Sequence, residues 1–229
     1  MQALPCNLVP AAILLACLLL HAVSGAAAGE ATARYLGTIS AENNAGFFAR
    51  VAGRPLQRLL IDSGGGDVAA AIELADWVHA RQLDITVTGV CLSSCANYVF
   101  PAARNKAIRP GAIVAWHGNY HHLAHTGLWR DDVVLRMQRD GEDEQTATRY
   151  VLAQVAHLVA LEREFFGRIG VDERVCWIGK QPPYNVADYY FLSATDMARF
   201  GITDVQVPAG YSATDLSGLG ASIVYLKLE

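Results

Sequence analysis

The stretch from residue 58 to residue 117 alternates strand-like and helix-like segments, and this order limits the fold more than any other feature of the sequence. "RLLIDS" (58–63) is an apolar run of strand length. "VAAAIELADWVHARQ" (68–82) has apolar residues at helical spacing behind Asp67, whose carboxylate suits a helix N-cap. "LDITVTGV" (83–90) alternates Ile and Val with Thr, as a strand does. Strand, helix and strand in this order predict an α/β fold.

Two further segments extend the same alternation. "SCANYVF" (94–100) predicts a short buried helix that ends at Pro101, because proline interrupts helical hydrogen bonding. "AIRPGAIVAWHG" (107–118) predicts a turn at Pro110–Gly111 and a strand that ends at His117.

The second half of the chain contains a long helical segment followed by short elements. Residues 131–170 are charged, lack proline and repeat apolar residues at helical spacing, so they predict one or two long amphipathic helices. The remaining segments predict, in order, a loop, a short helix capped by Ser193 and ended by Gly201, a strand and an edge strand: "KQPPYNVADYY" (180–190), "SATDMARFG" (193–201), "ITDVQV" (202–207) and "SIVYLKLE" (222–229).

The first 28 residues have the composition of an export signal. They contain no Lys, Arg, Asp or Glu, and the apolar run Ala11–Val23 is shorter than the ~20 residues that span a membrane. Ala26–Ala28 supplies the small residues found before a signal peptidase site. We therefore expect residues 1–28 to be a signal peptide and the protein to be periplasmic or secreted. Retention of the segment as a membrane anchor is the alternative.

Residues 29–229 are long enough to form a single domain with its own core. The net charge of the chain is −4 and no basic stripe is present, which argues against a nucleic-acid partner. Cys91, Cys95 and Cys176 follow the signal segment, and an oxidising compartment favours one disulfide and one free thiol among them. The sequence does not decide which pair forms.

The segment "GVCLSSCANYVF" (89–100) contains the first candidates for chemistry. It runs from a strand through a turn into a helix, a setting that exposes a serine hydroxyl and places the next N–H group where an oxyanion forms. Ser93 or Ser94 is therefore a candidate nucleophile, although a serine at a helix start is also an ordinary cap. "SGGGD" (63–67) adds glycines that either let the backbone approach a ligand closely or form a plain tight turn.

Histidines at the end of the predicted strand are the other candidates. His117 stands where a general base, a ligand or an ordinary polar residue would each fit. His121 and His125 have a spacing that binds zinc when it occurs on a helix, and His122 lies between them. The sequence has no H-E-x-x-H motif, so we interpret these residues as a solvated loop and expect no metal and no other cofactor.

Four segments occur in an order typical of one protein family: "LLIDSGGGDVAAAIELADWV" (59–78), "GVCLSSCANYVF" (89–100), "AIRPGAIVAWH" (107–117) and "FLSATDMARFGITDV" (191–205). Together they resemble the Clp protease proteolytic subunit and its relatives in the crotonase-like superfamily. The similarity is greatest to the exported branch, in which a Cys-x-Ser-x-Cys element surrounds the serine. The resemblance implies a ClpP/crotonase-like spiral of β-β-α units, with residues 131–170 as a long helical insertion.

The resemblance also implies roles for individual residues. Ser93 matches the nucleophile of the family, and His117 matches its general base. Gly65 and Ser94 match the two residues whose backbone N–H groups form the oxyanion hole. A Ser–His pair with two fixed N–H donors is the expected arrangement for acyl transfer.

The catalytic acid is where this sequence departs from the family pattern. The acid of the family aligns with Tyr189, so Asp188, one residue earlier, is the remaining candidate for orienting His117. If Asp188 points elsewhere, the site is either a Ser–His dyad or inactive.

These features lead to two expectations from different functional classes. The first is an ATP-independent, extracytoplasmic serine peptidase that acts on peptides or unfolded chains through an acyl-enzyme at Ser93. The second is a catalytically inactive relative that binds or scaffolds, and a metal site on the histidine cluster is a third. The resemblance implies a homo-oligomer, and a membrane contact is expected only if the N-terminal segment is retained.

Overall fold

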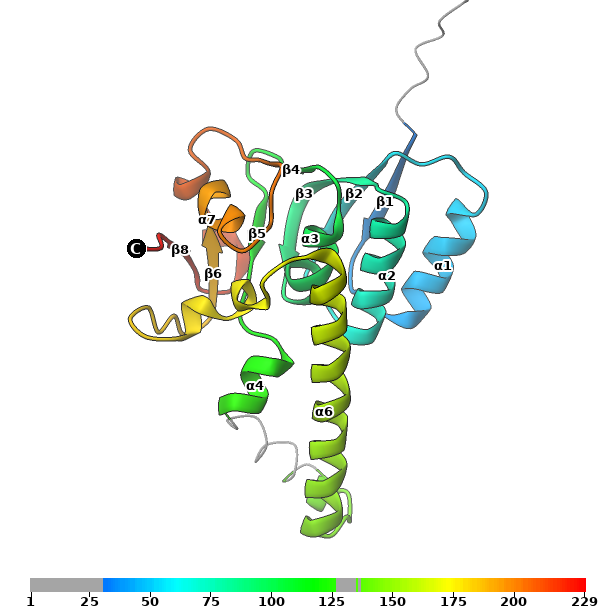
Figure 1. The fold of residues 1–229 in the computed structure, drawn as a ribbon, viewed down its shortest axis with the longest axis vertical. Coiled ribbons are helices and arrows are strands. Elements are labelled where there is room, and N and C mark those ends of the chain that lie inside the picture. The colour runs from blue at the N-terminus through cyan, green and yellow to red at the C-terminus, as the bar shows by residue number, and fades with distance from the viewer. Residues whose placement is uncertain (1–30, 127–134, 136) are drawn as a thin grey trace, which may run out of the picture.

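A parallel β-sheet forms the centre of the fold. The structure, a computed structural model, describes residues 31–126, 135 and 137–229 (Figure 1). The strands of the sheet are β1 (Thr32–Leu36), β2 (Arg58–Ser63), β3 (Asp84–Leu92), β4 (Lys106–Ile108), β5 (Ile113–Ala115) and β7 (Val205–Gln206). Their order is β1-β2-β3-β4-β7, with β5 also paired to β3, and every pair is parallel. The α/β prediction is therefore confirmed.

β2 and β3 lie in the middle of this sheet and carry much of its core. Leu59 and Ile61 of β2 and Ile85 and Val87 of β3 are fully buried. Helices cover parallel sheets on their faces, so central strands read as nearly continuous apolar runs. β2 is such a run, whereas β3 was recognised from its alternation of Ile and Val with Thr.

Among the described residues, the α-helices with defined bounds are α1 (Ala41–Val51), α2 (Val68–Ala80), α3 (Phe100–Ala102), α4 (Tyr120–Thr126), α6 (Glu144–Ile169) and α7 (Ala194–Ala198). Short 3-10 helices are η2 (Glu173–Cys176), η3 (Ile178–Lys180), η4 (Tyr211–Ala213) and η5 (Ser217–Leu219). The Asp67 carboxylate accepts a hydrogen bond of 2.8 Å from the N–H of Ala70, so the predicted cap of α2 is confirmed. Ser193 likewise caps α7, accepting a 3.0 Å hydrogen bond from the N–H of Asp196. Gly201 follows α7 with a φ of +87°.

The helix predicted to stop at Pro101 does not end there. A π-helical turn, η1 (Cys95–Val99), continues directly into α3, which includes Pro101 and ends after Ala102. Proline is accepted in the first turn of a helix because its missing N–H has no partner to lose there. The helical segment therefore extends two residues beyond its predicted last residue, Phe100.

A second, two-stranded sheet pairs β6 (Tyr189–Leu192) with β8 (Ile223–Leu226) in parallel. It joins the main sheet through Trp116, which exchanges hydrogen bonds of 2.8 and 2.9 Å with the backbone of Tyr190. β5 itself ends at Ala115, two residues before the predicted end. The loop predicted for residues 180–190 was wrong at its last two residues, because they begin β6.

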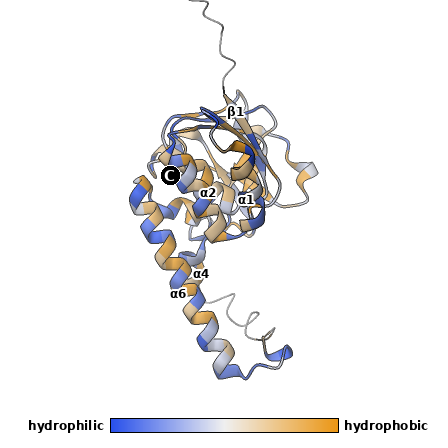
Figure 2. Cartoon of the chain, turned by 90° about the vertical axis from the view of Figure 1, so that its right-hand side faces the viewer, coloured by the Kyte–Doolittle hydropathy of each residue, from blue (hydrophilic) through white to orange (hydrophobic). Residues whose placement is uncertain are grey.

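α6 is the long amphipathic helix predicted within residues 131–170. Asp143 caps its start, and Gly170 ends it in the left-handed conformation with a φ of 67°. Its C-terminal part joins the main core through Phe165 and Phe166, while its N-terminal part extends well beyond the sheet (Figures 1 and 2). Figure 2 shows hydrophobic and hydrophilic residues interspersed along this helix.

The proposed signal peptide, residues 1–28, lies outside the described residues. Across the part of the chain that the structure does describe, no helix combines the length and the apolar composition needed to cross a bilayer.

Candidate active site

Ser93 lies on a sharp turn between β3 and η1. Its backbone has a φ of +55°, a left-handed conformation that is uncommon for residues other than glycine. The turn is fixed on both sides, because the Ser93 N–H donates to Ala115 O at 3.3 Å and its carbonyl accepts from the N–H of Asn97 at 2.8 Å. Unfavourable backbone geometry of this kind is found at functional sites, where the surrounding structure maintains it.

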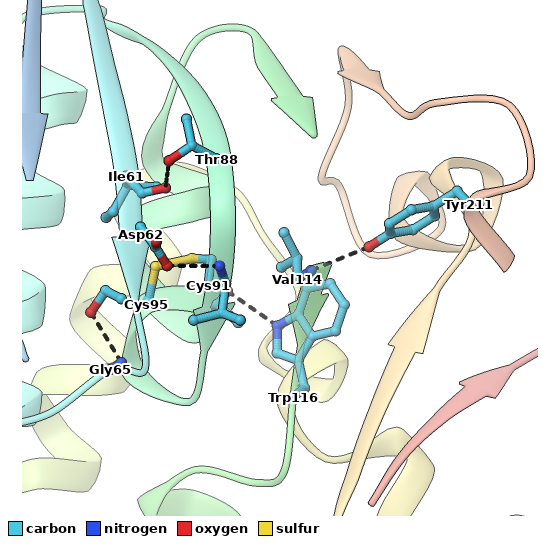
Figure 3. The surroundings of a disulfide bond; sticks show 12 residues. Ile61, Asp62, Gly65, Thr88, Cys91, Cys95, Val114, Trp116 and Tyr211 are labelled. Atoms are coloured by element: carbon cyan, nitrogen blue, oxygen red, sulfur yellow. Dashed lines mark hydrogen bonds between the residues drawn. A yellow bond between two sulfur atoms is a disulfide. The ribbon is translucent and has the colours of Figure 1, made fainter. Parts of the chain in front are cut away.

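A disulfide between Cys91 and Cys95 spans this turn (Figure 3). Cys91 lies on β3 and Cys95 begins η1, with 5.2 Å between their Cα atoms, and both residues are fully buried. The structure thus settles the pairing that the sequence left open. Of the three cysteines that the structure describes, Cys176 is the one with a free thiol, and burial raises its pKa well above the usual value.

Ser93 and His117 lie within hydrogen-bonding distance of each other. His117 Nε2 is 2.8 Å from Ser93 Oγ, although the two residues are 24 positions apart in the chain. Parallel pairing of β5 with β3 brings the two strand ends together. The His117 ring also stacks on Tyr189, with 4.5 Å between the ring centroids.

The surroundings of His117 favour its neutral form. Neighbouring protein atoms remove water from part of the ring, and this desolvation is the main reason that the pKa of His117 falls below 6.5. The positive charge of Lys180 lowers this pKa further, whereas the negative charge of Asp188 opposes the shift. Neutral imidazole is the form that can accept a proton from a hydroxyl.

The negative charge of Asp188 acts on the pKa of His117, but the Asp188 carboxylate is hydrogen-bonded to a different residue. Its Oδ2 accepts a 3.0 Å hydrogen bond from the N–H of Ser222, and its backbone carbonyl accepts one from Lys180 Nζ. Within the described residues, no hydrogen bond joins the Asp188 carboxylate to His117. The bonded unit of the site is therefore a Ser–His pair.

The glycine loop before α2 packs directly against the Ser93 turn. Gly65 has a φ of +92°, and a Cβ atom at this position would lie 2.6 Å from Leu92 O and 2.9 Å from Ser94 N. Ser94 Oγ donates a 2.7 Å hydrogen bond to Gly66 O, which ties the two loops together. Only a glycine allows the backbones to approach this closely.

The N–H of Gly65 is already used within its own loop. It donates to Ser63 Oγ at 3.1 Å, whereas the next residue, Gly66, lines the open cleft beside Ser93 and Ser94. Sequence reasoning missed Gly66. The run of three glycines indicated a loop close to a ligand, but it did not show which of the three glycines would have a free N–H group.

The cleft beside Ser93 has a volume of about 310 Å³. Apolar side chains from three helices form part of its wall, among them Val68 of α2, Leu123 of α4 and Leu158 of α6. Two asparagines, Asn97 and Asn119, also line it. The cleft therefore offers room and mixed chemistry for one substrate side chain next to the serine.

Glu162 of α6 is hydrogen-bonded to two residues that line this cleft, Tyr98 and Tyr120, and was not anticipated from the sequence. Its carboxylate is fully buried and accepts hydrogen bonds from Tyr98 Oη, from the N–H of Tyr120 at 3.0 Å and from the N–H of His121 at 2.9 Å. Burial raises its pKa, although these three donors oppose the shift. A lone acidic residue within the apolar stripe of α6 was the available signal.

The histidine cluster occupies α4 as a separate group. His121 Nδ1 is 2.7 Å from Glu173 Oε1, and the rings of His121 and His125 are 5.1 Å apart. Among residues 31–126, 135 and 137–229, no group of three or more His, Cys, Asp or Glu side chains is arranged to hold a metal ion. The third expectation, a metal site on this cluster, has no support in these contacts.

The geometry of the Ser93–His117 site, rather than similarity to a known protein, is the main basis for assigning a function. No protein-family model matches this chain, and no curated protein matches it at a significant level.

Proposed function

We propose that this protein is a serine hydrolase, most specifically a peptidase that forms an acyl-enzyme on Ser93. The observation that carries this proposal is the 2.8 Å contact between His117 Nε2 and Ser93 Oγ on a turn with a φ of +55°. A nucleophile within hydrogen-bonding reach of a neutral histidine is the basic requirement for this chemistry. The motif resemblance supports the same assignment and adds the ClpP/crotonase-like spiral as the proposed fold family.

The proposed reaction begins when His117 Nε2 takes the proton of Ser93 Oγ as the oxygen attacks a peptide carbonyl carbon. The carbonyl oxygen becomes an oxyanion, which collapses with cleavage of the C–N bond as His117 gives its proton to the leaving amine. Water then repeats the sequence on the Ser93 ester, releasing the acid and restoring both side chains. The cycle consumes one water molecule and requires no cofactor.

Backbone N–H groups beside Ser93 are the proposed oxyanion donors. The N–H of Ser94 follows the nucleophile directly, as the mechanism requires. The second donor was expected from Gly65, but that group is bonded to Ser63 Oγ. Gly66, which lines the cleft, is the better placed of the two glycines, and we propose it for this role.

The proposed substrates are peptides or unfolded chains in an extracytoplasmic compartment. The buried disulfide between Cys91 and Cys95 is compatible with export, because such bonds persist in oxidising environments. The resemblance supplies the remaining elements of the proposal, namely ATP-independent action and a homo-oligomeric assembly.

A non-catalytic binding protein is the second proposal, and one observation favours it. The Asp188 carboxylate is bonded to the N–H of Ser222, and among residues 31–126, 135 and 137–229 no carboxylate is hydrogen-bonded to the His117 imidazole to fix its orientation. Losing that partner reduces the rate by ~10⁴ in a well-studied triad even when the geometry is preserved.

Covalent labelling with a fluorophosphonate probe tests the first proposal against the second. We expect the wild-type protein to be labelled and Ser93→Ala to be unlabelled. Ser94→Ala keeps its N–H group but loses the hydrogen bond to Gly66 O, so it should be labelled more slowly. Absence of labelling in folded wild-type protein would favour the binding protein, and labelling that persists in Ser93→Ala would exclude Ser93 as the nucleophile.

A further inference from the structure

The side chain of His117 is exposed, so the orientation of its imidazole depends on the few contacts that hold it. An exposed side chain changes rotamer freely unless a contact favours one rotamer over the others. Across the described residues, the ring makes one hydrogen-bonding contact, with Ser93, and one stacking contact, with Tyr189. Ser93 is the group to be activated, so Tyr189 is the contact that can hold the ring while the Ser93 proton moves.

The pairing of the two sheets places Tyr189 directly opposite His117. Trp116 and Tyr190 form an antiparallel bridge and exchange backbone hydrogen bonds of 2.8 and 2.9 Å. The adjacent residues of the two chains, His117 and Tyr189, therefore form the next cross-strand pair, in which facing side chains lie close together. Their ring centroids are 4.5 Å apart and their planes differ by 26°. The stack is thus a consequence of the backbone register.

The backbone that carries Tyr189 is firmly held. The N–H of Tyr189 donates to Ser222 O at 3.0 Å. The next residue, Tyr190, is fully buried, and its hydroxyl donates to Val175 O at 2.6 Å. A Cβ atom at Gly179 would lie 2.5 Å from the Tyr190 ring, so this ring fills the space available to it. Tyr189 therefore projects from a fixed position on β6.

Asp188 and Tyr189 are neighbours in the chain, but their side chains contact different partners. The Asp188 carboxylate accepts from the N–H of Ser222, just before β8, whereas the Tyr189 ring stacks on His117, just after β5. A shift of one residue changes which side chain stands opposite a given position on the neighbouring strand. The position opposite the imidazole is therefore taken by an aromatic ring, and the carboxylate lies one residue away from it.

We infer that Tyr189 is a positioning residue, whose stacked ring holds the imidazole of His117 with Nε2 facing Ser93 Oγ. In a Ser-His-Asp triad, a hydrogen-bonded carboxylate has this orienting role. In the part of the chain that the structure describes, no hydrogen bond involves the Tyr189 hydroxyl, so the aromatic face is the part that acts. The inference rests on the proposed hydrolase for its catalytic consequence, but the orientation of the ring can be measured separately.

The rotamer of His117 provides the direct test and requires no catalysis. NMR couplings in protein with isotopically labelled histidine measure whether χ1 of His117 has one value or several. We expect a single rotamer in the wild-type protein and in Tyr189→Phe, which keeps the ring. Tyr189→Leu keeps an apolar side chain but removes the flat face, so it should show averaging over several rotamers. A single rotamer in Tyr189→Leu would overturn the inference, as would averaging in the wild-type protein.

Tyr189→Asp tests the register on which the inference depends. A carboxylate directly opposite His117 is close enough for its charge to raise the pKa of the imidazole by about 1 or more. NMR titration of His117 measures this change. Val224→Asp adds the same charge at an exposed position on β8 and should change the pKa much less. An unchanged His117 pKa in folded Tyr189→Asp would overturn the inference, and thermal melting checks that the variants are folded.

Fluorophosphonate labelling measures the catalytic consequence. The dependence of the labelling rate on probe concentration separates probe binding from the chemical step at Ser93. We expect Tyr189→Leu to slow the chemical step by roughly tenfold or more, since a misplacement of 1 Å can cost ~100-fold. Probe binding should be unchanged, and Tyr189→Phe should restore the wild-type rate. Tyr225→Leu, which removes a half-buried ring from β8, is the control for loss of aromatic packing.

The two proposals fail in distinguishable ways. Labelling of the wild-type protein with an unchanged chemical step in Tyr189→Leu would retain the hydrolase and reject the positioning role. A single His117 rotamer that is lost in Tyr189→Leu, without labelling of the wild-type protein, would retain the positioning role and reject the hydrolase.

Discussion

At the scale of single residues, the site depends on the close approach of two backbone segments, the glycine loop before α2 and the turn at Ser93. Gly65 lies against the Ser93 turn, and the left-handed φ at both positions is maintained by the contact between their loops. The sequence revealed the serine and the glycines because their order is distinctive. It did not reveal that Gly65 donates to Ser63 or that Asp188 binds Ser222, because both depend on side-chain orientation within the folded structure.

Gly65→Ala should destabilise the protein and impair the site. The added Cβ would lie 2.6 Å from Leu92 O, and alanine would also be strained at a φ of +92°. We expect the free energy of unfolding to fall by ~1–3 kcal/mol, measured by urea denaturation, together with slower fluorophosphonate labelling. Gly64→Ala is the matched control, because a Cβ there has no atom within 4 Å. Equal effects of the two substitutions would contradict the close-packing argument.

The acid limb of the pH profile should report the lowered pKa of His117. A general base acts only when neutral, so hydrolysis is present above this pKa and is lost as the pH falls through it. We expect the midpoint of kcat/KM on the acid side to lie below 6.5. Lys180→Gln removes a charge that lowers this pKa and should move the limb to higher pH, whereas Lys227→Gln, an exposed lysine after β8, should not. A wild-type midpoint above 6.5 would contradict the assignment.

At the scale of helices and strands, the sequence was sufficient to predict those elements whose own residues carry a clear apolar pattern or cap. β2, α2 and β3 have apolar patterns and caps that can be recognised without knowledge of their neighbours. β6 was missed because its first two residues were assigned to the preceding loop, although Tyr189, Tyr190 and Phe191 favour strands; β6 pairs with β8, more than thirty residues away along the chain. α1 was overlooked despite a local signal, since Ser40 caps it by accepting from the N–H of Asn43.

The position of α4 should depend on Glu162 of α6. This buried carboxylate accepts from Tyr98 Oη and from the first N–H groups of α4, so it links the long helix to the wall of the cleft. Glu162→Gln replaces one acceptor oxygen with a donor and should lower the free energy of unfolding by ~1–3 kcal/mol, measured by denaturation. Glu164→Gln, on the exposed side of the same helix, is the control. If Glu162→Gln is as stable as wild type, the proposed link is wrong.

At the scale of the whole molecule, α6 is longer than the core that it packs against. Phe165 and Phe166 belong to the main core, whereas Ala147 and Val151 form a small separate cluster with Met137. Leu152 on the extended part is 49% exposed. The sequence predicted a long helix here, but its amphipathic pattern alone did not show how little of it would contact the sheet.

The family resemblance implies a homo-oligomer, and the extended part of α6 is where we expect subunits to meet. Leu152→Glu would place a charge in such an interface and should reduce the molar mass measured by light scattering to that of a smaller species. Gln154→Glu, an exposed position on the same helix, should leave the mass unchanged. A monomeric wild-type protein would contradict the expected assembly.

The disulfide between Cys91 and Cys95 encloses Ser93 within a loop of five residues. A crosslink of this kind removes open conformations of the chain that it encloses, and so it limits the freedom of the nucleophile itself. A newly made chain still in a reducing compartment would carry the same serine and histidine on an unlocked turn. Under the proposed export, oxidation after export would complete the site, and precursor molecules that are not exported would keep the serine on a turn without its crosslink.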